Sequence, residues 1–133
     1  MTTMQVAPQP HPGHWGPRLL RWTPRVLSIL FIAFIALFAL DVFDAGYSFW
    51  ETIVGLFMHL LPNLALLAVV ILAWRWPWVG AIGFLGFAGW YLVTFGMTNN
   101  WSFDWSVYAL LAGIPALIGV LYLADWFVRR RTA

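Results

Sequence analysis

The chain has 133 residues, of which 62% are hydrophobic and only 9% charged, so it lacks the charge for a water-exposed globular surface and favours a bilayer as solvent. Cysteine is absent, which excludes disulfides, thiolate metal sites and thiol nucleophiles. The formal charge of +2 includes seven arginines and no lysine, and their positions fit membrane orientation better than nucleic-acid binding.

Residues 1–17 contain four prolines and little that is apolar, so we expect a disordered cytoplasmic tail. His11 and His14 lie three residues apart in this tail. A flexible segment offers no preformed metal site, and we predict no bound metal there. The transmembrane domain is expected over residues 18–131.

An apolar run at 26–43 follows Arg18, Arg21 and Arg25, and its length approaches the roughly 30 Å of a hydrocarbon core. Charged residues follow the run where a signal peptide would have a small-residue cleavage site, so we expect an uncleaved helix. Pro77 is placed to start a later helix. The sequence predicts an all-α bundle of four transmembrane helices at about 26–43, 52–73, 79–97 and 105–127.

The charges alternate between the ends of these spans. With a cytoplasmic N-terminus, every arginine falls inside, while Asp44, Glu51 and Asp104 fall outside. The positive-inside rule therefore predicts that both termini are cytoplasmic. Tryptophans cluster at both predicted boundaries, as amphipathic rings do in membranes.

A shift of the sequence by 53 residues suggests an internal repeat. Without a gap it aligns Pro24 with Pro77, Glu51 with Asp104, and Pro62 with Pro115. The bundle can thus consist of two duplicated helical hairpins. Apolar segments of restricted composition also align easily by chance, so both interpretations stay open.

Small residues recur at helical spacing in the third and fourth predicted helices. Such residues let helix backbones approach closely in lipid. We expect the two helices to pack through them. The residues are Gly80, Gly83, Gly86 and Gly89 in the third helix, and Ala112 and Ala116 in the fourth.

The second helix carries the most polar residues predicted at membrane depth. His59 and Asn63 fall on one stripe, with Glu51 slightly to one side and Asp41 near the outer end of the first helix. One hypothesis is a short polar path for ions or protons that opens to the outer face. The other, which we favour, is that His59 and Asn63 hydrogen-bond neighbouring helices and fix the bundle. Haem or pigment ligation by His59 is a third alternative, although a two-histidine haem would need a dimer.

No nucleophile motif, phosphate-binding loop or dinucleotide-binding motif occurs, so we expect no enzymatic activity and no cofactor. Asp125, near the inner end of the fourth helix, is expected to pair with Arg75 or Arg129 as an interfacial anchor.

The segments FALDVF (Phe38 to Phe43) and SFWETIVGLFMHLLPNLALLAVVILAWRW (Ser48 to Trp76) carry a family resemblance. Through Asp41, the Phe49 to Thr52 segment and His59, the chain resembles a family of small bacterial four-helix membrane proteins classed as a domain of unknown function. The likeness spans residues 21–127. It implies a fold and a bacterial inner-membrane location, but no activity.

These observations predict a structural or accessory membrane protein in contact with the lipid bilayer, forming a homo-oligomer or joining a larger membrane complex. No nucleic-acid partner is expected. The alternative is a small transporter or ion-conducting subunit built on the polar stripe.

Overall fold

The computed structural model describes residues 15–102 and 104–132, and within these ranges every regular element is helical. Of the predicted tail, residues 1–14 lie outside the described residues, whereas residues 15–17 belong to a helix. A proline at position 17 is compatible with that helix because backbone N–H groups of a first turn have no intrahelical acceptor. The elements in chain order are α1 (Trp15–Leu37), η1 (Phe38–Leu40), α2 (Asp41–Asp44), α3 (Phe49–Arg75), α4 (Pro77–Thr98), α5 (Trp105–Tyr108), η2 (Ala109–Gly113) and α6 (Ile114–Thr132).

Four helical stretches are long and apolar enough to cross a membrane, which confirms the all-α class with four candidate spans. They cover Arg18–Asp44, Phe49–Arg75, Pro77–Thr98 and Trp105–Arg131. Each is longer than the apolar run from which it was predicted, because the helices continue through the polar residues at their ends. Spans of this composition place the chain in contact with a lipid bilayer.

The first and fourth spans are each built from several helical pieces. In the first, α1 continues through the 3₁₀ turn η1 into α2, and Gly46, at a φ of 69°, then reverses the chain towards α3. In the fourth, the π-helical turn η2 ends two residues before Pro115. Pro115 has no N–H to donate to the carbonyl of Leu111, and a widened turn accommodates the missing hydrogen bond.

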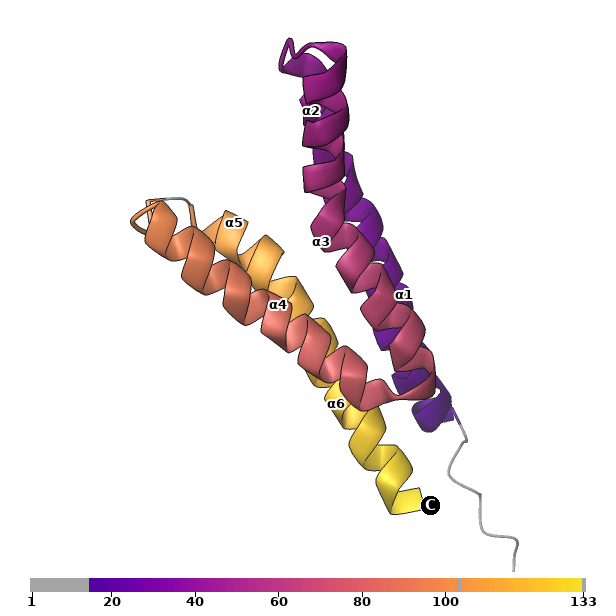
Figure 1. Cartoon of the computed structure of the whole chain (residues 1–133). Coiled ribbons are helices and arrows are strands. Elements are labelled where there is room, and N and C mark those ends of the chain that lie inside the picture. Colours follow the sequence, from indigo (N-terminus) through magenta and orange to yellow (C-terminus); the bar gives the residue numbers. More distant parts are fainter. Residues whose placement is uncertain (1–14, 103, 133) are drawn as a thin grey trace, which may run out of the picture.

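The helices form two hairpins arranged as a V (Figure 1). One hairpin pairs α1 with α3 and the other pairs α4 with α6. The hairpins meet near the α3–α4 turn and diverge towards their opposite ends. The start of α1 and the end of α6 both lie at the joined end of the V.

The hydrophobic core fills this joined half. Phe84 stacks on Tyr122 with ring centroids 6.0 Å apart, and Phe31 meets Phe84 edge-on at 6.5 Å. These rings come from α4, α6 and α1, so the two hairpins share one core. The cluster consists of Phe31, Leu66, Val70, Ala73, Ala81, Phe84, Ile118 and Tyr122.

The small residues predicted to join the last two helices do not all lie between those helices. At Gly80 an added Cβ would lie 2.8 Å from the Tyr122 ring of α6, whereas at Gly83 it would lie 2.4 Å from Val69 of α3. At Gly86 and Gly89 it would meet nothing within 4 Å. On the other side, Ala112 is buried in η2 and Ala116 is half-buried in α6. The α4 and α6 helices do pack together, but Gly86 and Gly89 are not part of that contact.

The two hairpins follow one another in the chain, as a duplication would require, yet their acidic landmarks differ in detail. Glu51 is the third residue of α3, while Asp104 is the N-cap of α5. The duplication therefore stays a hypothesis.

Candidate functional site

Glu51, predicted as part of a polar stripe, forms hydrogen bonds with Ser48 at the start of α3. Its Oε2 atom accepts hydrogen bonds from the backbone N–H and the hydroxyl of Ser48, at 2.9 Å and 2.7 Å. Ser48 is the N-cap of α3, so the carboxylate lies beside the positive end of the helix dipole. The Ser-x-x-Glu spacing is the sequence signal of this capping arrangement, and our sequence analysis missed it.

His59 lies one turn after Gly55 and its side chain is exposed on the protein surface. Its Nδ1 atom is 3.0 Å from the carbonyl oxygen of Gly55. His59 and Glu51 both line a cavity of about 430 Å³ near the open end of the first hairpin. Asp41, which is exposed at the start of α2, is not among its lining residues. The remaining lining residues are Val42, Tyr47, Trp50, Val54, Gly55 and Met58.

Asn63 is separated from these residues by its burial. Its side chain is 4% exposed, and both amide atoms lack a hydrogen-bond partner among the described residues. It belongs to the buried face of α3 that continues through Leu66, Val70 and Ala73 into the core. The structure thus places Glu51 and His59 at one cavity, but does not bring Asp41 or Asn63 to it.

Two further cavities lie where the hairpins diverge, and we call them together the interhelical cleft. One, of about 570 Å³, lies between α3 and α4 and contains the small residues Ala65, Gly83 and Gly86. The other, of about 350 Å³, also reaches α1 and η2 through Ile35 and Leu111. Both share the walls Met58, Pro62, Phe87 and Trp90. The cleft is almost wholly apolar, and His59 lines the second cavity.

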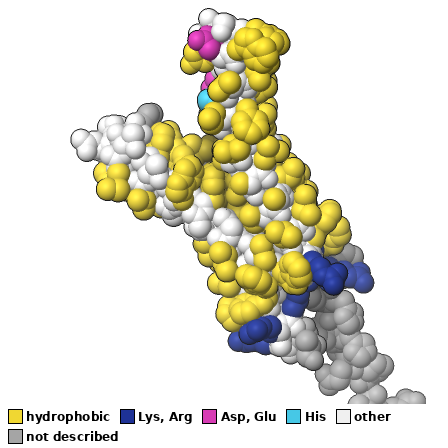
Figure 2. Space-filling view, viewed as in Figure 1, with side chains coloured by type: hydrophobic (Ala, Val, Ile, Leu, Met, Phe, Trp, Pro, Cys, Tyr) yellow, Lys and Arg dark blue, Asp and Glu magenta, His cyan; other side chains and the backbone are white. Residues whose placement is uncertain are grey.

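Charge is segregated along the molecule. Figure 2 shows arginine side chains at the joined end of the V and acidic side chains at the far end of the first hairpin. The exception is Asp125, which is 3% exposed and lies in α6 at the arginine-rich end. It accepts hydrogen bonds from Arg129, with Nε to Oδ1 at 3.1 Å and an ion pair at 2.8 Å. The sequence predicted Arg75 or Arg129 as the partner of Asp125, and in the structure the partner is Arg129.

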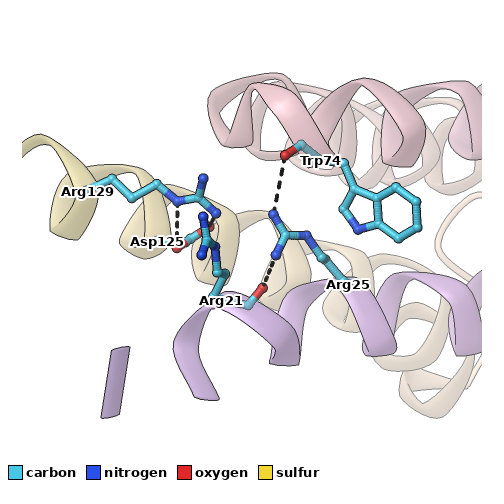
Figure 3. Close-up of polar contacts among 5 residues, drawn as sticks. All are labelled: Arg21, Arg25, Trp74, Asp125 and Arg129. Atoms are coloured by element: carbon cyan, nitrogen blue, oxygen red, sulfur yellow. Dashed lines mark hydrogen bonds and ion pairs between the residues drawn. The ribbon is translucent and has the colours of Figure 1, made fainter. Parts of the chain in front are cut away.

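Arg25 is the buried cation of this end and was not singled out by the sequence analysis. It is 6% exposed and donates to the carbonyl oxygens of Arg21 at 3.0 Å and Trp74 at 3.4 Å (Figure 3). It therefore connects α1 to the end of α3. Arg25 directly precedes the apolar run at 26–43 and lies closer to it than Arg18 and Arg21, and this position is the signal that distinguishes it.

The profile of a family described as a domain of unknown function (DUF7670) matches residues 14–133. The chain belongs to this family. Neither a curated protein nor a solved structure gave a match. The family thus covers nearly the whole four-span region, and it carries no assigned activity.

Proposed function

We propose that this member of the family is a non-enzymatic accessory subunit of a membrane assembly, and that it associates with a second copy of itself through the interhelical cleft. The cleft is the observation that carries the proposal. Its largest cavity, about 570 Å³, is open and apolar, and small residues line it on both hairpins. In lipid, helices associate where small side chains allow their backbones to approach closely.

The extent of the described chain supports a role within the membrane. Among the described residues from 15 to 132, only short connections at 45–48, 76, 99–102 and 104 lie outside the helices. These connections provide little surface for a reaction in water. Any function of this region therefore uses the helices themselves, and contact between helices is what exposed Gly86 and Gly89 favour.

A second copy fits the cleft because each chain has both a cleft and a projecting arm. The arm consists of η1, α2 and the first turns of α3, and its main contacts are within its own hairpin. If two V-shaped molecules pair about a two-fold axis, each arm can enter the other cleft. Such an arrangement is closed and would give a defined dimer.

The oligomeric state in liposomes tests the proposal through single-molecule photobleaching at decreasing protein density. Gly86 lies in the cleft, whereas Gly113 lies outside it, and an added Cβ at either glycine meets no described atom within 4 Å. We expect a dimer for the wild type and for Gly113→Leu. Gly86→Leu should weaken dimerisation at least tenfold while the monomer keeps its fold. A monomeric wild type at every density, or equal dimerisation of both variants, would refute the proposal.

We further propose that the protein resides in a bacterial inner membrane with both termini cytoplasmic. The start of α1, the α3–α4 turn and the end of α6 share one end of the molecule, and the arginines gather there. Fusions of alkaline phosphatase and of green fluorescent protein after residue 133 test this orientation. We expect fluorescence without phosphatase activity, and the reverse would contradict it.

Ion or proton conduction is a second candidate function, favoured by the cavity that Glu51 and His59 share. Wild-type proteoliposomes would then carry flux that His59→Ala abolishes. Glu51→Gln keeps an oxygen that can accept from Ser48, so it would test the charge without removing the cap. No flux by the wild type under either a proton or a potassium gradient would eliminate this candidate.

A further inference from the structure

Four charged side chains come together at the joined end of the V, and we call them the arginine node. They are Arg21 and Arg25 of α1 and Asp125 and Arg129 of α6. Figure 3 shows the Arg21 side chain extending from α1 towards the Asp125–Arg129 pair, with Arg25 beside it. The node thus joins the first and the last span of the chain.

The guanidinium group of Arg25 is fixed by hydrogen bonds to two backbone carbonyl oxygens. Its two backbone acceptors lie on different helices, Arg21 on α1 and Trp74 on α3. Its Nε atom is buried and has no partner among the described residues. A guanidinium group fixed in this way cannot turn out to water, so its positive charge remains at the junction of the helices.

The charges within the node do not balance. The node contains three guanidinium groups and one carboxylate, and both oxygens of that carboxylate accept hydrogen bonds from Arg129. Within the described part of the chain, neither Arg21 nor Arg25 forms an ion pair with a carboxylate. Like charges in a partly desolvated site repel one another, and an added anion would relieve this repulsion.

The surroundings place this excess charge at the depth of lipid headgroups. Trp22 is exposed on α1, and the guanidinium of Arg130 lies 4.3 Å from the centre of the Trp126 ring. Tryptophan rings prefer the interface between hydrocarbon and water. Arg18 and Arg21, both exposed, lie three residues apart on α1 and share one side of the helix at this level.

We propose that Arg18 and Arg21 bind the phosphodiester group of an anionic phospholipid, with the fixed charge of Arg25 behind them. Guanidinium groups match phosphate oxygens in charge and in planar geometry. Basic clusters beside membrane helices select anionic headgroups over zwitterionic ones. The bound lipid neutralises the node and so stabilises the contact between α1, α3 and α6.

The full-length protein in nanodiscs tests this proposal. We compare its melting temperature in bilayers of phosphatidylcholine alone and of phosphatidylcholine with phosphatidylglycerol. The anionic lipid should raise the melting temperature by about 4 °C or more. Arg21→Gln should lose most of this gain. Arg131→Gln, which removes an exposed arginine of the same membrane end outside the node, should keep it.

A third variant should change the lipid-dependent gain in melting temperature in the opposite direction. Asp125→Asn removes the only carboxylate of the node, so its gain from phosphatidylglycerol should exceed that of the wild type. Native mass spectrometry provides a measurement independent of folding: the wild type should retain phosphatidylglycerol over phosphatidylcholine, and Arg21→Gln should not.

Three outcomes would overturn the proposal. Equal losses of the lipid-dependent gain in Arg21→Gln and Arg131→Gln would indicate a general surface charge effect without a site. If phosphatidylglycerol does not raise the melting temperature of the wild type, the anionic lipid does not stabilise the protein. An equal gain from inorganic phosphate in pure phosphatidylcholine nanodiscs would identify a soluble anion, not a lipid, as the ligand.

Discussion

Gly80 of α4 lies against the ring of Tyr122 of α6, so closely that a Cβ at Gly80 would come within 2.8 Å of two ring carbons. The same added atom would lie 2.9 Å from the Cβ of Ala73 in α3. This one backbone position therefore sets the approach of three helices in the shared core. Two other glycines of the same stripe, Gly86 and Gly89, have open space around them among the described residues.

The contrast between these glycines gives the first prediction. Gly80→Ala should lower the free energy of unfolding by about 1–3 kcal/mol because the buried Tyr122 ring cannot move away without disturbing the core. Gly86→Ala should change it little or raise it by about 0.5–1 kcal/mol, since alanine favours the helix. Denaturation of both variants by sodium dodecyl sulfate in bicelles measures the difference. Equal stabilities would contradict the packing described for Gly80.

Asn63 gives the second prediction because its amide is buried without a partner among the described residues. Replacing an unsatisfied buried polar side chain by an apolar one of similar size removes a desolvation cost of about 1–3 kcal/mol. Asn63→Leu should therefore raise the melting temperature of the protein in detergent. A lower melting temperature would show that the amide has a hydrogen-bond partner in the folded protein.

Glu51 distinguishes a cap from a residue of an ion path. Glu51→Ala removes the acceptor for the Ser48 N–H and hydroxyl, so backbone amides in the first turn of α3 should exchange with deuterium faster. Glu51→Gln should stay close to the wild type, because its carbonyl oxygen still accepts. The rest of α3 serves as the internal control. If the alanine variant exchanges as slowly as the wild type, the cap contributes nothing.

Asp125 gives a fourth prediction for the arginine-rich end. Asp125→Ala leaves Arg129 without its ion-pair partner beside the buried charge of Arg25, and this should lower the free energy of unfolding by about 1–3 kcal/mol. Asp44→Ala, at an exposed position of the opposite end, is the matched control and should have little effect. Thermal unfolding in phosphatidylcholine nanodiscs measures both. Similar melting temperatures for the two variants would mean that the node does not stabilise the bundle.

The number and type of the membrane helices could be read from the sequence for a simple physical reason. An apolar segment in lipid must satisfy its backbone hydrogen bonds internally, so length and hydropathy alone indicate a helix. The pairing of Asp125 with Arg129 was also within reach, because residues four apart are neighbours on a helix. The helix ends were less accessible: α1 already includes Trp15, and the capping of α3 by Ser48 and Glu51 extends that helix beyond the apolar run.

The candidate sites depended on information that helical periodicity does not contain. Periodicity placed Glu51, His59 and Asn63 along one side of a helix, but only the neighbouring helices show that Asn63 is buried while His59 is exposed. Likewise, the four glycines spaced three apart in α4, from Gly80 to Gly89, looked equivalent in the sequence. Their different surroundings arise because the hairpins diverge, so that Gly80 lies in the joined half and Gly86 lies in the cleft.

The sequence by itself determined that the chain forms four apolar helices with its arginines at one end, because hydrophobic length and charge act locally along the chain. The tertiary structure decided that the hairpins form a V, that Arg25 is buried between α1 and α3, and that Arg21 and Arg25 lie near the Asp125–Arg129 pair. These features depend on which helix faces meet. In lipid, that choice rests on packing and polar contacts between distant residues, since hydrophobicity no longer distinguishes a neighbouring helix from the solvent.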